Sequence, residues 1–151
     1  MSTEHDTAIH RRVFALRAGE DPSLIARLPS GWAVLGTQQF LRGYSLLLPD
    51  PVVPHLNDMV PAHRAQFLAD MASLGDAVLA VTGALRINYA MFGNVEPALH
   101  AHVIPRYRDE PVALRTAHPW SYDWNAAPTL APGALAALRR QIADAIKKFT
   151  A

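Results

Sequence analysis

Two histidines, His100 and His102, lie two residues apart in the apolar segment NVEPALHAHVIPRY (94–107). Because side chains of an extended strand alternate between two faces, both imidazoles are predicted to leave the same face, about 7 Å apart. A neutral imidazole is a good nucleophile towards phosphorus or carbonyl carbon, and a protonated neighbour can stabilise the anion that forms. The turn at Gly93 and Asn94 offers hydrogen-bond donors for phosphate oxygens. The segment therefore predicts nucleophilic chemistry at an anionic centre.

The histidine pair is open to two other interpretations. Histidines on a solvated sheet face need no function. Two histidines on a strand can also supply two zinc ligands, with a third from His55, His63, His118 or a carboxylate, although nothing in the spacing requires one. The chain has no cysteines, which excludes disulfides and thiolate metal sites. We therefore expect no bound metal, with zinc as the weaker alternative.

The elements that would hold the histidines are predicted from hydrophobic periodicity. Apolar residues recur at steps of three and four over 61–82, which predicts a long amphipathic helix that Pro61 begins and Gly83 ends. Strands are expected at 31–37, 44–49, 86–93 and 99–107. A short helix is expected at 7–19, a loop with room for one short strand at 20–31, and a helix near the C-terminus.

This order of elements predicts the fold class. Two strands, a long helix and two further strands favour an α+β protein: an antiparallel sheet with one long covering helix and a C-terminal helix. The Leu99, Ala101 and Val103 side chains are expected to pack on the long helix. The two histidines would then lie on the opposite face of the sheet.

Composition limits the partners and the location. With 151 residues, the chain is predicted to be a single domain, 1–151. A formal net charge of +1 without a long basic run argues against nucleic acid as a partner. No apolar run approaches the roughly 20 residues of a membrane span, so no membrane partner is expected. The polar N-terminus lacks the apolar region of a signal peptide, and together with the absence of cysteines it favours a cytoplasmic location.

The string GNVEPALHAHVIPRY resembles the signature of the histidine triad (HIT) superfamily, in which three histidines alternate with apolar residues before a Pro-Arg-like tail. The strings WAVLGTQQFLRGYSLLLPD and INYAMFGN resemble the paired strands of the family and the strand that leads into the motif. The resemblance covers about 31–107. It implies a HIT-like core over that range, followed by a C-terminal loop and helix over 108–151.

The resemblance implies an activity and roles for named residues. The central motif histidine, here His100, would attack the α-phosphorus of a nucleotide derivative and form a covalent nucleotidyl-histidine. His102 and Asn94 would contact the phosphate. Asn88 and Gly93 would help to bind the nucleotide.

The same resemblance implies the substrate class and assembly. Expected substrates are dinucleoside polyphosphates, such as diadenosine tetraphosphate, or nucleoside monophosphate derivatives. The protein would be a hydrolase or transferase that requires no cofactor, although Mg²⁺ can accompany a polyphosphate substrate. A homodimer is implied as well.

The sequence departs from the family motif at two places. Ala98 replaces the first motif histidine, and the Gly-His pair of the family is Gly43-Tyr44 here. These departures leave open a second hypothesis, a nucleotide-binding module with weak or no catalysis.

Two roles are considered for each of several residues near the motif. Arg106 is expected to be a surface or salt-bridge arginine, or else a phosphate contact. Three aromatic residues of the C-terminal loop are expected to be packing anchors, or else a lid over a nucleotide base: Trp120, Tyr122 and Trp124.

Overall fold

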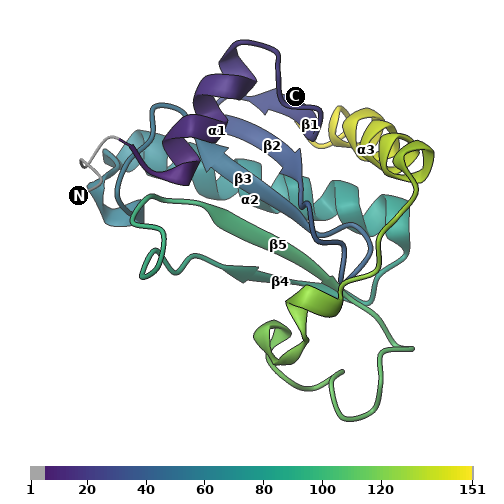
Figure 1. Ribbon diagram of the computed structural model, residues 1–151. Coiled ribbons are helices and arrows are strands. Elements are labelled where there is room, and N and C mark those ends of the chain that lie inside the picture. The colour runs from purple at the N-terminus through teal and green to yellow at the C-terminus, as the bar shows by residue number, and fades with distance from the viewer. Residues whose placement is uncertain (1–5, 151) are drawn as a thin grey trace.

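The computed structural model of the protein describes residues 6–150 (Figure 1), so 1–5 of the polar N-terminus and residue 151 lie outside the described residues. Five antiparallel strands form one sheet in the order β1-β2-β3-β5-β4. The strands are β1 (Leu24–Leu28), β2 (Gly31–Leu35), β3 (Ser45–Pro49), β4 (Arg86–Ala90) and β5 (Ala101–Arg106). The helices are α1 (Ala8–Arg17), α2 (Pro61–Thr82) and α3 (Pro132–Ile146), with 3-10 turns at Leu56–Asp58, Pro119–Ser121 and Trp124–Ala126. This architecture confirms the predicted α+β class.

The long helix α2 has the predicted bounds. Pro61 occupies its first turn, where a backbone N–H has no partner within the helix, and Gly83 ends it in the left-handed conformation with φ 66°. Phe67, Leu74 and Val78 of its apolar stripe are fully buried. Among residues 6–150, neither α2 nor any other helix combines the length and the apolarity needed to cross a membrane.

The sheet has a different covering on each face. Ala101 and Val103 of β5 are buried with residues of α2 and α3, as expected. Ile104, which points the other way, is buried with Val13 of α1. Figure 1 shows α1 in front of the sheet and α2 behind it. The prediction that the histidine face lies opposite the long helix is therefore confirmed.

One short strand lies in the segment 20–31, as the sequence allowed, whereas the motif strand starts at a different residue than predicted. The segment 20–31 contains the edge strand β1, whose Ile25 and Leu28 are buried beside α3, although Pro22 and Pro29 flank it. The sheet thus begins before the expected core. The motif strand β5 begins two residues later than predicted, because the Leu99 N–H donates to the Val53 carbonyl, 2.8 Å away, instead of joining the ladder with β4.

One buried carboxylate joins α2 to the turn between β1 and β2. Asp70 is 2% exposed and accepts hydrogen bonds from the Ser30 N–H at 2.8 Å, from the Ser30 hydroxyl, and from the Gln66 amide at 2.8 Å. Every one of these donors would lose its acceptor if the carboxylate were removed.

Asp70→Ala is expected to lower the free energy of unfolding by about 2–3 kcal/mol, because it leaves the buried Ser30 N–H unpaired. Urea denaturation followed by circular dichroism measures this loss. Asp76→Ala is a matched control, since Asp76 is exposed on the same helix. Equal stabilities for the two variants would contradict the role of Asp70.

Candidate active site

The two motif histidines lie side by side at the start of β5. Their ring centroids are 5.0 Å apart with an angle of 74° between the planes, closer than the 7 Å expected from strand geometry. His102 lies between Leu46 of β3 and Ala90 of β4 in the sheet register, and His100 lies just before the strand. Both side chains are half-buried.

His100 is held by the backbone of the residue that replaces the first motif histidine. Its Nδ1 lies 2.7 Å from the Ala98 carbonyl oxygen. A carbonyl only accepts hydrogen bonds, so Nδ1 carries the proton and Nε2 of the neutral ring keeps its lone pair. Because a backbone carbonyl supplies this contact, the orientation of His100 does not require a histidine side chain at position 98.

A cavity of about 220 Å³ adjoins His100. Its wall includes the loop before α2, at Pro54 and His55, and the segment after β4, at Phe92 and Gly93. The predicted site residue Gly93 is thus brought to His100. His55, one of the candidate third zinc ligands, also lies beside this cavity.

His102 lies in an aromatic enclosure that the sequence did not reveal. The Tyr44 hydroxyl lies 2.7 Å from its Nδ1, and the two rings are nearly parallel at 5.9 Å. The Phe92 ring is 6.2 Å away and the Trp120 ring 4.9 Å away. Burial, reinforced by the nearby His100, lowers the pKa of His102 to about 4. His102 is therefore neutral near pH 7 and does not act as the protonated neighbour that the motif allows.

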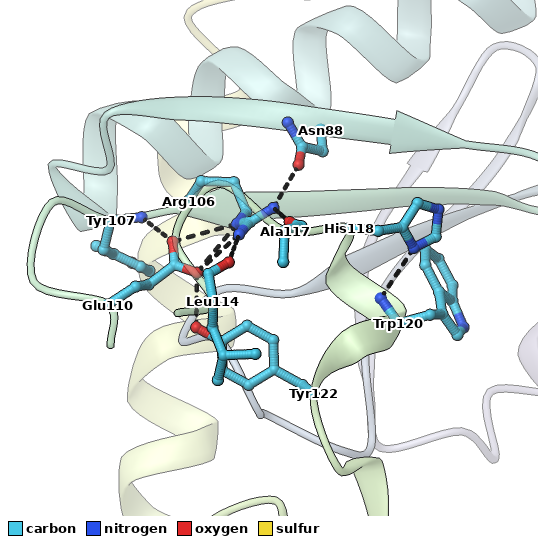
Figure 2. Close-up of polar contacts among 9 residues, drawn as sticks. All are labelled: Asn88, Arg106, Tyr107, Glu110, Leu114, Ala117, His118, Trp120 and Tyr122. Atoms are coloured by element: carbon cyan, nitrogen blue, oxygen red, sulfur yellow. Dashed lines mark hydrogen bonds and ion pairs between the residues drawn. The ribbon is translucent and has the colours of Figure 1, made fainter. Parts of the chain in front are cut away.

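The C-terminal loop brings Trp120 to the site. Its ring meets Phe92 edge to face at 4.8 Å and stacks near Trp124 at 5.3 Å. Its backbone N–H donates to Nδ1 of His118, 3.2 Å away (Figure 2). The aromatic residues thus pack together as expected, and Trp120 in addition forms one side of the histidine site.

Arg106 is a buried anchor for this loop. Figure 2 shows its guanidinium enclosed by hydrogen-bond acceptors. It donates to the Glu110 carboxylate at 3.0–3.1 Å, to the Asn88 amide oxygen at 2.9 Å, and to the carbonyls of Ala117 at 2.9 Å and Leu114 at 2.8 Å. All three guanidinium nitrogens are engaged. Arg106 therefore forms the predicted salt bridge. Its nitrogens are taken up by acceptors of the protein, so the structure does not favour a phosphate contact.

Glu110 receives further donors from its surroundings. The Tyr122 hydroxyl and the Tyr107 N–H both donate to it at 2.6 Å. Burial alone would raise the pKa of Glu110, but the hydrogen bonds from Arg106 and Tyr122 outweigh burial and hold that pKa below its usual range. The loop is thus tied to β5 by an ionised pair.

The two predicted asparagines lie in different surroundings. Asn88 is on β4, on the same face as the histidines, and its amide oxygen is occupied by Arg106, which leaves its N–H groups as donors. Asn94 is exposed in the turn before Ala98 and is not among the residues around the cavity. Their roles in binding phosphate or nucleotide stay predictions.

The zinc hypothesis needs a third ligand near the histidine pair. Within residues 6–150, no three His, Asp or Glu side chains are grouped closely enough to hold a metal ion. The described part of the chain therefore offers no complete set of zinc ligands.

The five-stranded sheet and the long helix behind it form a fold that is also found in solved histidine triad proteins. Comparison with solved structures finds the same fold in a histidine triad protein from Marinobacter aquaeolei, with TM-score 0.75 and 16% identity over 95% of this chain and 98% of that one. A histidine triad protein from Bradyrhizobium japonicum is 26% identical, with TM-score 0.57, over 83% and 94% of the two chains. A hypothetical histidine triad nucleotide-binding protein from Sulfolobus tokodaii has TM-score 0.69 and 13% identity, over 89% of each chain.

The chain shares the fold of solved histidine triad proteins, as the resemblance of the motif predicted. No family model matches the sequence, and no curated protein is significantly similar to it. The chain therefore has this fold with an alanine, Ala98, at the position that the resemblance gives to the first motif histidine.

Proposed function

We propose that the protein is a nucleotide hydrolase or nucleotidyl transferase that acts at an α-phosphate through a covalent nucleotidyl-His100. The observation that carries this proposal is the hydrogen bond from Nδ1 of His100 to the Ala98 carbonyl, which leaves Nε2 as an unprotonated nucleophile beside a cavity. The nucleotide-binding protein from Sulfolobus tokodaii, which shares the fold, supports the choice of a nucleotide as ligand.

The proposed reaction has two steps. Nε2 of His100 attacks the α-phosphorus, a P–N bond forms, and the bond from phosphorus to the leaving group breaks. Water or another acceptor then attacks the same phosphorus and releases His100. His102, with Asn94, Asn88 and Gly93 as further candidates, contacts the phosphate and nucleotide.

The chemistry of this nucleophile sets the requirement for cofactors. A neutral imidazole attacks phosphorus without activation by a metal, so none is needed for the covalent step. Mg²⁺ would enter with a polyphosphate substrate. We propose dinucleoside polyphosphates or nucleoside monophosphate derivatives as substrates, and a cytoplasmic homodimer as the working form.

A labelled substrate tests the proposal. Incubation with radiolabelled diadenosine tetraphosphate, followed by rapid denaturation, is expected to leave a labelled protein adduct that is acid-labile and base-stable. Turnover without any adduct would contradict the covalent mechanism.

The replacement of the first motif histidine by Ala98 favours one second candidate, a nucleotide-binding module. This candidate predicts tight binding of the same nucleotide with neither an adduct nor turnover. The incubation therefore distinguishes the two functions directly.

A further inference from the structure

We propose that Tyr44 donates its hydroxyl hydrogen to Nδ1 of His102, so that His102 acts as a neutral donor through Nε2 and the site favours substrates whose leaving group departs as a phosphate-type anion. Tyr44 is thus a positioning residue that acts through His102. The inference rests on the proposed attack by His100 and specifies its substrate class.

The place of Tyr44 is built into the fold. Its side chain is 4% exposed, just before β3, and its hydroxyl lies 2.7 Å from Nδ1 of His102. Gly36 provides the room for the ring, because a Cβ at that position would lie 2.3 Å from a ring carbon of Tyr44. Among the described residues, the hydroxyl of Tyr44 has one hydrogen-bond partner, which is His102.

The direction of the hydrogen bond follows from what each group can do. If Nδ1 of His102 carried the proton, the hydroxyl of Tyr44 would accept, and its own hydrogen would be a buried donor without an acceptor. Such an unpaired donor costs about 1–3 kcal/mol. Burial raises the pKa of Tyr44 well above its usual value, against a smaller opposite effect of Arg12, so the hydroxyl keeps its hydrogen. Donation from Tyr44 is therefore favoured.

The surroundings of His102 keep it neutral. Tyr44 faces it from the start of β3, His100 from the start of β5, Phe92 from the segment after β4 and Trp120 from the C-terminal loop. None of these contacts is a carboxylate that could stabilise an imidazolium. Burial and the neighbouring His100 both disfavour the charged ring.

The two histidines then have complementary tautomers. His100 carries its proton on Nδ1 and presents a bare Nε2, whereas His102 has a bare Nδ1 and presents N–H at Nε2. One ring can attack phosphorus while the other donates a hydrogen bond to a phosphate oxygen. Neither role requires a protonated imidazole.

This arrangement discriminates between leaving groups. In the first step the P–N bond to His100 forms, and the P–O bond of an anhydride breaks with its electron pair on the departing phosphate oxygen. No proton has to move, because a phosphate leaves as a stable anion. An amine that leaves from a phosphoramidate must gain a proton, which a neutral His102 does not release. In the second step water attacks phosphorus, the electron pair of the P–N bond returns to Nε2, and the proton of water passes to solvent.

The two departures from the family motif then have one structural explanation. Ala98 and Tyr44 lie in the same buried cluster on the histidine face of the sheet. Ala98 retains the carbonyl that orients His100, and Tyr44 orients His102. We infer that the replacement of both motif residues leaves a working pair of histidines.

The tautomer is read directly by nitrogen-15 NMR of the resting protein. Wild type is expected to show His102 protonated at Nε2 and bare at Nδ1, and Tyr44→Phe to show a mixture of both tautomers. Tyr89→Phe is the control, because Tyr89 is a partly exposed tyrosine whose hydroxyl lies against α2. A wild-type His102 protonated at Nδ1 overturns the assignment of Tyr44 as donor, whatever the activity.

Paired kinetics test the leaving group. Wild type is expected to have at least a tenfold higher kcat/KM for diadenosine tetraphosphate than for adenosine 5′-phosphoramidate. Tyr44→Phe should lower kcat for the tetraphosphate about tenfold, the effect of one hydrogen bond. Equal kcat/KM values for the two substrates in wild type overturn the leaving-group preference. If neither substrate is turned over while the Nε2–H tautomer is observed, the proposed function fails, and the leaving-group preference fails with it.

Discussion

His100→Ala is expected to reduce turnover of a nucleotide substrate by about 10⁴- to 10⁶-fold, because it removes the atom that attacks phosphorus. No nucleotidyl adduct should form. The half-buried ring makes one hydrogen bond, to the Ala98 carbonyl, so the free energy of unfolding should change by about 1 kcal/mol or less. Steady-state kinetics and urea denaturation on the same preparation measure both effects.

His63→Ala is the matched control for this variant. His63 lies in the first turn of α2, outside the residues around the cavity. Its removal should leave kcat within about twofold of wild type. Full activity of His100→Ala on every nucleotide tested would show that another residue is the nucleophile.

Arg106→Met is expected to lower the free energy of unfolding by about 3–5 kcal/mol, since it leaves the Glu110 carboxylate buried without its cationic partner. The side chain of Glu110 is only 3% exposed. Activity should fall as well, because the loop that carries Trp120 is tied to β5 through this pair. Urea denaturation at pH 7 measures the loss, and Arg140→Met, an exposed arginine on α3, is the control.

The stability that the pair of Arg106 and Glu110 contributes depends on pH. The folded-state pKa of Glu110 is below its ordinary value of 4.5, so the pair contributes stability above that value and loses it as the pH falls through the folded pKa. Wild type should therefore lose stability on acidification below about pH 4.5. Arg106→Met removes the hydrogen bonds and the charge of Arg106 that lower the pKa of Glu110, so this pKa should rise and the variant should lose less stability than wild type on acidification. The difference in the free energy of unfolding between wild type and Arg106→Met should therefore be smaller below about pH 4.5 than at pH 7. A difference of the same size under the two conditions would contradict the role assigned to the pair.

Periodicity predicted the parts of the fold that pack through a regular apolar pattern. The helix α2 has its predicted bounds because a proline and a glycine mark its ends and its stripe faces the sheet. For 20–31 the sequence indicates only a loop with room for one short strand, because prolines flank the five residues of β1 and its pairing with β2 comes from tertiary contacts. The start of β5 was misplaced because Val53, far away in the sequence, takes the Leu99 N–H.

The candidate site was predictable in its chemistry and less so in its surroundings. The spacing of His100 and His102 indicated one shared face, and the structure places them on it. Nothing local in the sequence indicated that Tyr44 would bond to His102 or that Trp120 would enclose it. Tyr44 is 58 residues away along the chain, and Trp120 reaches the site through a loop anchored by a buried ion pair. One indication in the sequence favoured a place for Tyr44 at the site: it stands where the family has the histidine of its Gly-His pair.

A crystal soaked with a nucleoside monophosphate tests the central claim most directly. The α-phosphorus is expected within about 3.5 Å of Nε2 of His100, with a phosphate oxygen in hydrogen-bond range of Nε2 of His102. A phosphate bound elsewhere on the molecule, with the nitrogen of His100 facing only solvent, would contradict the account.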